Sequence, residues 1–118
     1  MKYTDWIKEN EDGNVQEYIA FCRSNGQQID LSGADLSEAD MRWADLSEAD
    51  MSEADLSGAD LSEADMSRAN LRGADLGGAD LIGTDLREAN LRWADLRWAD
   101  LSEADMSEAD LSGADLSG

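Results

Sequence analysis

The chain has 118 residues and carries 28 acidic side chains against nine Lys or Arg, which gives a formal net charge of −19. With one cysteine and no histidine it can form neither an internal disulfide framework nor a zinc site of Cys and His ligands. Its negative field repels nucleic acid and anionic lipid, so we expect no direct nucleic-acid binding and no membrane partner.

The first 28 residues contain one predicted helix. Four apolar residues in this segment fall on one helical face: Val15, Tyr18, Ile19 and Cys22. Asn14 can cap the helix and Asn25-Gly26 can end it, which places it at about residues 14–24. Trp6 and Ile7 are expected to add a short apolar strand or turn. The residues that follow form a series of repeats, and a stack of repeats needs an atypical element over its open end. We therefore interpret residues 1–28 as a capping segment. The alternative is a partner-binding helix.

No stretch of the sequence predicts export or membrane insertion. Met1-Lys2-Tyr3 leads into a charged segment, and no run of 18 apolar residues occurs. A cytoplasmic protein is therefore expected.

Residues 29–118 read in units of five without a break, eighteen units in all. The third residue of each unit is Leu or Met, and the first is Ala except at Ile29 and Thr84. A fixed internal period of this kind sets the architecture of a chain. We therefore expect residues 29–118 to form one repeat domain.

Neither a helix nor a flat strand accommodates a period of five. An α-helix turns by about 100° per residue, so the large apolar residues would spiral around all its sides. A flat strand needs a period of two. A backbone that turns a corner in each unit solves the problem, because four corners close a coil of twenty residues with Leu, Met and Ala inside. Eighteen units then make about 4.5 coils, spaced by about 4.8 Å as in a sheet.

The unit Ala-[Asp/Asn]-[Leu/Met]-x-x resembles the signature of the pentapeptide-repeat family, and the resemblance covers 90 of the 118 residues. It implies an all-β solenoid, namely a right-handed quadrilateral parallel β-helix, here of about 4.5 coils with an N-terminal α-helical cap. Many members place Phe at some large apolar positions, whereas this chain has only Leu and Met there.

The second residue of each unit is Asp sixteen times and Asn twice, at Asn70 and Asn90. We interpret the Asp rows as solvated acidic faces, because a five-residue unit lacks the glycine pattern of calcium-binding turns. No metal site is expected. Residues twenty apart should stack, which places Arg68 between Glu48 and Glu88 and predicts an ion pair between coils.

Arg and Trp side chains break the acidic pattern near the end of the chain. The candidate interaction patch consists of Arg72, Arg87, Arg92, Trp93, Arg97 and Trp98. Such residues often anchor protein interfaces. Alternatively, the indoles only cover glycine backbone and the arginines only offset the repulsion between Asp side chains. Trp93 is expected to lie between Gly73 and Gly113, and Trp98 between Gly78 and Gly118.

The last coil shows no capping element in the sequence. Its apolar layer would consist of Leu101, Met106, Leu111 and Leu116. Since an open coil end invites edge pairing, we expect a homodimer that forms end to end through this layer. An engineered or truncated chain is the competing interpretation.

The sequence contains no catalytic constellation. Cys22 has no histidine to activate it, and nothing distinguishes one carboxylate pair among so many. We therefore expect no enzyme and no cofactor, but a structural or protein-interaction module whose protein partner is unknown. The resemblance implies one alternative, an acidic DNA mimic that binds DNA gyrase or a related topoisomerase, as the quinolone-resistance members do.

Overall fold

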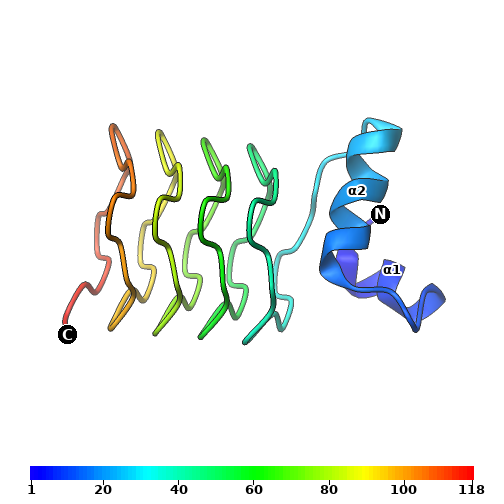
Figure 1. Ribbon diagram of the computed structural model, residues 1–118, viewed down its shortest axis with the longest axis horizontal. Coiled ribbons are helices and arrows are strands. Elements are labelled where there is room, and N and C mark those ends of the chain that lie inside the picture. Colours follow the sequence, from blue (N-terminus) through cyan, green and yellow to red (C-terminus); the bar gives the residue numbers. More distant parts are fainter.

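The computed structural model describes residues 1–118. Two helices, α1 (Tyr3–Glu9) and α2 (Val15–Asn25), precede a row of stacked coils (Figure 1). The helices lie at one end of the row and the C-terminus lies at the other, in a molecule of 38 × 22 × 21 Å. Neither helix has the length or apolar character needed to cross a membrane.

The predicted helix is present as α2. The side chain of Asn14 accepts a hydrogen bond of 3.0 Å from the Glu17 N–H, which satisfies one of the free donors at the helix start. Gly26 ends the helix with a left-handed backbone (φ 63°), and its N–H donates to the Cys22 carbonyl.

The expectation of a strand or turn at Trp6-Ile7, and of a single helix in residues 1–28, is wrong. These residues lie in α1. A seven-residue helix is not stable in isolation, so tertiary packing must hold it. The buried Trp6 ring packs against Tyr18 and Phe21, with ring centroids 5.6 and 6.2 Å away. This aromatic cluster supplies the burial that stabilises α1.

Residues twenty apart pair in parallel throughout the repeats, in four rows that we call faces. The first face contains Asp30, Asp50, Asn70, Asn90 and Asp110; the second, third and fourth faces begin at Asp35, Asp40 and Asp45. In a typical step the Leu31 N–H donates to the Asp50 carbonyl (2.7 Å), and the Asp50 N–H donates to the Ile29 carbonyl (2.9 Å). Each coil is thus bound to the next on all four faces.

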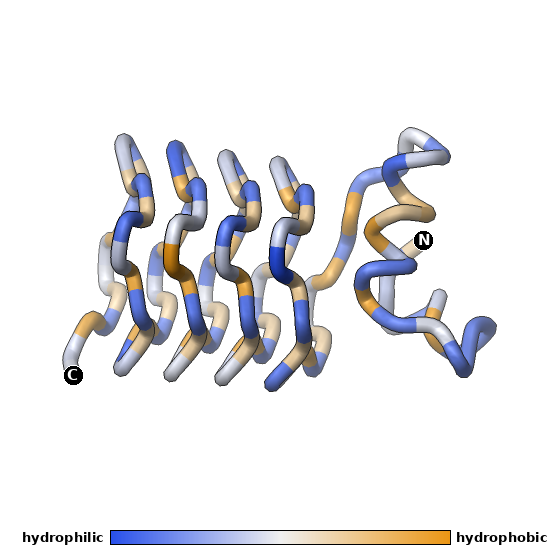
Figure 2. Tube along the Cα trace, in the orientation of Figure 1, coloured by the Kyte–Doolittle hydropathy of each residue, from blue (hydrophilic) through white to orange (hydrophobic).

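The core runs along the axis of the stack. In the inner coils the large apolar residue of each unit is fully buried, as at Met66 and Leu71, and the Ala two positions earlier is buried beside it. Hydrophobic positions accordingly recur between hydrophilic ones along every coil (Figure 2). Burying one such Leu contributes about 1.5–3 kcal/mol. Thr84, which replaces an Ala, donates its buried hydroxyl to the Leu61 carbonyl (3.0 Å).

Side chains of α2 supply hydrogen bonds to the first coil, which has no preceding coil to supply them. In the inner coils, row carbonyl groups accept backbone N–H groups from the coil before. In the first coil, Arg23 Nη2 donates to the Asp45 and Ser47 carbonyls at 3.0 and 2.9 Å. Gln16 Nε2 donates to the Asp40 carbonyl at 3.3 Å. These contacts hold α2 against the third and fourth faces.

Candidate interaction site

The backbone presents the last residue of every unit at a corner of the coil. All eighteen of these residues have positive φ, whether glycine or not; Trp93 and Trp98 have φ of 64° and 66°. A left-handed backbone costs an L-residue about 1–2 kcal/mol relative to its usual conformation. The indoles therefore occupy positions where glycine would be conformationally easier.

A side-chain turn precedes each corner and was not foreseen from the sequence. In all eighteen units the Asp or Asn accepts a hydrogen bond from the backbone N–H two residues later. Where that residue is Ser, its hydroxyl usually donates as well, as from Ser57 to Asp55 Oδ1 (2.6 Å). These bonds lower the pKa of carboxyls such as Asp100 and Asp110. The signal was the spacing Asp-x-Ser, which is typical of such turns.

The two indoles of the candidate patch lie over glycines of the following coil. The rings of Trp93 and Trp98 occupy the space that a Cβ on Gly113 and on Gly118 would need. The expected contact of Trp98 with Gly78 is wrong, since nothing lies within 4 Å of a Cβ built there, and the nearest neighbour of Gly73 is Glu53. Trp93 and Trp98 remain 60% and 78% exposed, because each ring is covered on one side only.

Two of the predicted patch arginines already have carboxylate partners within the chain. Arg87 Nη2 lies 2.6 Å from Asp85 Oδ2, and Arg97 Nη2 lies 2.7 Å from Asp95 Oδ2. Hydrogen bonding to these guanidinium groups holds the pKa of Asp85 and Asp95 below the usual value. Arg42 makes the same contact with the Asp two positions before it.

The other two patch arginines lack such a partner. Arg72 and Arg92 follow Asn70 and Asn90, whose side-chain oxygens accept the backbone N–H of the arginine at 3.1 Å but carry no charge for its guanidinium group. Arg72 forms no ion pair, and the carboxylate that Arg92 approaches, Asp110, is 4.0 Å away. Both residues lie on the first face in successive coils, because Asn70 and Asn90 pair.

The six predicted patch residues therefore do not form one uniform surface. Arg87 lies on the fourth face, Arg97 and Trp98 on the second, and the remaining three on the first. The structure places Arg72, Arg92 and Trp93 together and separates the ion-paired arginines from them.

The predicted ion pair between coils is confirmed on the fourth face. Arg68 Nε lies 2.8 Å from Glu88 Oε2, and Arg68 Nη1 lies 3.6 Å from Glu48 Oε1. All three side chains are exposed, so the contribution to stability is small.

The predicted dimer layer is only partly covered. Leu101, Met106 and Leu111 are half-buried and Leu116 is 51% exposed. The backbone N–H groups of the first three have no backbone acceptor. End-to-end homodimerisation through this layer stays a prediction.

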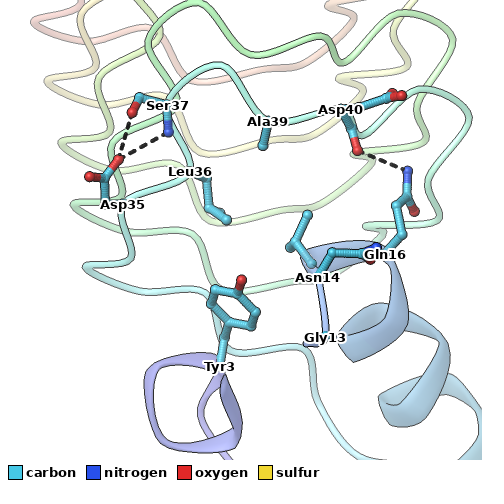
Figure 3. A pocket seen from close by; sticks show the side chains of 10 residues that line it. Tyr3, Gly13, Asn14, Gln16, Asp35, Leu36, Ser37, Ala39 and Asp40 are labelled. Carbon is cyan, nitrogen blue, oxygen red and sulfur yellow. Dashed lines mark hydrogen bonds between the residues drawn. The ribbon is translucent and has the colours of Figure 1, made fainter. Parts of the chain in front are cut away.

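A pocket of 410 Å³ lies between the helices and the first coil. Figure 3 shows Tyr3, Asn14 and Gln16 on the helical side, with Asp35 and Asp40 across from them. The pocket borders the second face, where no side chain of the helices donates a hydrogen bond to the carbonyl groups of the first coil. Both carboxylates are already hydrogen-bonded, Asp35 to Ser37 and Asp40 to Arg42.

Elsewhere the chain offers little reactive chemistry. No group of three Asp, Glu, Cys or His side chains is arranged to hold a metal ion. Cys22 is fully buried in the helical segment.

Comparison with known proteins bears on the repeats. A family model described as pentapeptide repeats matches in eight copies, over residues 27–62, 49–87, 64–102 and 89–118. A search of curated protein sequences finds no significant match.

Several solved structures are similar. The pentapeptide repeat protein Rfr23 from the cyanobacterium Cyanothece 51142 is 33% identical, with a TM-score of 0.71 over 76% of this chain and 60% of its own. A pentapeptide repeat protein from Nostoc PCC 7120 is 32% identical, with a TM-score of 0.72 over 85% and 93%. One from the thylakoid lumen of Arabidopsis thaliana is 35% identical, with a TM-score of 0.52 over 75% and 55%.

Proposed function

The chain belongs to the pentapeptide-repeat family, whose members form right-handed β-helices, and on that premise we propose that it is a non-enzymatic protein-interaction module. Its binding residues are among the outward-facing last two residues of the units. The inner positions are filled by packed side chains, and the hollow along the repeats is lined by no hydrophobic residue but by polar ones such as Ser47, Glu48 and Arg68.

The observation that carries this proposal is the exposure of Trp93 and Trp98. Both indoles project from left-handed corners that glycine would occupy at lower cost, and both keep more than half of their surface in water. Exposed Trp beside Arg is typical of the anchors that dominate protein interfaces. The indoles therefore supply apolar contact area on an otherwise acidic surface.

The test compares partner recovery by variants of the whole chain. Trp93→Ala/Trp98→Ala should lose a partner that wild type retains from a lysate of the organism that encodes the protein. Trp43→Ala is the matched control, because Trp43 is 75% exposed at a similar corner of the third face. Equal recovery by all three proteins would remove the proposal.

A second candidate is the acidic DNA mimic that binds DNA gyrase or a related topoisomerase. The observation that favours it is charge density. The repeats carry a net charge of −17. Over about 22 Å of stacked coils this is one charge per about 1.3 Å, close to the one per about 1.7 Å of duplex DNA. The cross-section of 22 × 21 Å is similarly narrow in both directions.

A gyrase supercoiling assay tests the second candidate. The protein at micromolar concentration should inhibit supercoiling or protect the enzyme from a quinolone. Absence of both effects would exclude the DNA mimic, and only the interaction module would then stand.

The proposal includes the finer architecture. The four rows are the sides of a square coil, residues 29–118 make about 4.5 coils, and residues 1–28 form an α-helical cap. Hydrogen exchange tests the cap. Arg23→Ala should speed exchange in the first coil, at Ala44 and Glu48, and leave the third coil unchanged. Uniform rates in all coils would contradict a capping role.

A further inference from the structure

Five arginines occupy the same place in the repeat unit, directly after the large apolar residue, yet they have two different environments. Three of them chelate the carboxylate two positions earlier: Arg42, Arg87 and Arg97. The other two, Arg72 and Arg92, follow the only two asparagines in the row positions. The sequence thus removes a carboxylate at two of the five places where an arginine would bind it.

The exchange of Asp for Asn changes the charge and leaves the turn intact. Asn70 and Asn90 still accept the backbone N–H two residues later, at 3.1 Å in both units. The exchange removes the contact between the row side chain and the arginine guanidinium. In an intact pair, Arg87 donates from Nε to Asp85 Oδ1 (2.9 Å) and from Nη2 to Asp85 Oδ2. An amide cannot offer two acceptors to the same guanidinium, because its nitrogen is a donor.

The two guanidinium groups that lack a chelating carboxylate are neighbours, and the one ion pair that either of them forms is the 4.0 Å contact of Arg92 with Asp110. Arg72 and Arg92 lie in successive coils of the first face, so their backbones are about 4.8 Å apart. Like charges at this separation repel each other unless an anion lies between them. A carboxylate or phosphate group offers several acceptor oxygens and can bind two arginines at once.

Trp93 gives the pair an apolar border. It follows Arg92 directly, lies over Gly113 and keeps 60% of its surface exposed. The charged and apolar parts together fit an extended segment that carries an anionic group next to an apolar side chain.

We propose that Arg72 and Arg92 form an oxyanion-binding pair, which with Trp93 binds an anionic group of a partner-protein segment. This inference rests on the proposed interaction function and names the chemistry of the partner. The oxyanion is the carboxylate of Asp or Glu, or the phosphate of a phosphorylated residue. The arginines of the other faces take no part, because each is already paired with a carboxylate of this chain.

Titration with small peptides tests the pair on the full chain. The probes are N-acetyl-Phe-Glu amide, N-acetyl-Phe-phosphoserine amide and the neutral N-acetyl-Phe-Gln amide. The Nε–H resonances of Arg72 and Arg92 and the indole resonance of Trp93 should shift and saturate with either anionic probe and not with the neutral one. Arg87 and Arg97 are internal controls and should shift at least tenfold less. Saturation by the glutamate probe assigns the site to carboxylates, and saturation by the phosphoserine probe alone assigns it to phosphate.

The matched variant is Asn70→Asp/Asn90→Asp, which introduces the residue found in the other sixteen units and so preserves the fold. It should weaken binding of the anionic probes at least tenfold, because each arginine gains an internal carboxylate. Equal binding by this variant, or equal shifts of all four arginines in wild type, would overturn the proposal. The partner-recovery assay distinguishes failure of the oxyanion pair from failure of the interaction function. If Trp93→Ala/Trp98→Ala loses the partner and Asn70→Asp/Asn90→Asp keeps it, the interaction function stands and the oxyanion pair is wrong.

Discussion

Two adjacent glycines, Gly77 and Gly78, allow the cost of the left-handed corner to be measured. Gly78 is a corner residue with φ of 67°, and no atom lies within 4 Å of a Cβ built on it. Gly77 has a negative φ. Replacing each in turn by Ala therefore adds the same methyl group in two backbone conformations.

The structure gives the expected magnitudes. At Gly78 the left-handed conformation costs an L-residue about 1–2 kcal/mol. Loss of glycine freedom in the unfolded chain returns about 0.4–1 kcal/mol, so Gly78→Ala should destabilise the protein by about 1 kcal/mol. Gly77→Ala should stabilise it by about 0.4–1 kcal/mol, because only the unfolded-state effect remains. Its Cβ would stand 3.1 Å from Asp75 Oδ1. Ser, Arg or Ile occupies this place in all other units, so the contact is accommodated.

Urea denaturation followed by circular dichroism measures both variants against wild type. The free energies of unfolding of the two variants should differ by about 1–2 kcal/mol, with Gly78→Ala the less stable. If Gly78→Ala were as stable as Gly77→Ala, the left-handed corners would carry no conformational cost. The inference that Trp93 and Trp98 occupy costly positions would then fail with it.

Other predictions concern the core, the turns, pH and self-association. Leu71→Ala should lower the free energy of unfolding by about 2–5 kcal/mol in the same assay, because it opens a cavity at a fully buried position; a loss below 1 kcal/mol would contradict the packed core. Asp55→Ala should cost about 1 kcal/mol and Asp55→Asn much less, since only Asn keeps an acceptor for the Ser57 N–H; equal losses would exclude the turn as the cause. The turn carboxyls with lowered pKa stabilise the fold fully above their unfolded value of 3.8, and this contribution disappears as the pH falls through the lower folded values. At 0.5 M NaCl, which screens the general repulsion, the urea midpoint should fall between about pH 4 and pH 2; a constant or rising midpoint would contradict this. Light scattering should show a dimer in wild type and a monomer in Leu111→Arg, and a wild-type monomer at high concentration would remove the end-to-end prediction.

The repeat arrangement was predictable because packing sets it. One large apolar residue in every fifth position excludes both helix and flat strand, and the twenty-residue spacing then places Arg68 beside Glu48 and Glu88, as the structure shows. In contrast, α1 was missed. Its seven residues have little local helical preference, and only the packing of Trp6 against Tyr18 and Phe21 makes the helix form.

The candidate site was predictable by residue type and not by grouping. Residue type alone identifies the arginines and tryptophans as candidates, but it does not distinguish Arg87 and Arg97 from Arg72 and Arg92. What separates them is a two-residue interaction, the chelation of a guanidinium by the preceding Asp, which Asn cannot repeat. The direction in which Trp98 leans depends on the left-handed corner, and so it could not be derived from the stacking of columns alone.

The twenty-residue pairing also determines how such a surface can change. Deleting one unit, for example residues 79–83, would move Arg92 to the face next to that of Arg72, while the large inward positions would still be Leu or Met and the small ones Ala or Thr. Deleting four consecutive units would shorten the molecule by one coil and keep all later residues on their original faces. Gains and losses of single units therefore rearrange the outer surface around the axis, whereas changes of whole coils alter only its length. A site built from two coils, such as Arg72 and Arg92, depends on the phase of the repeat between them.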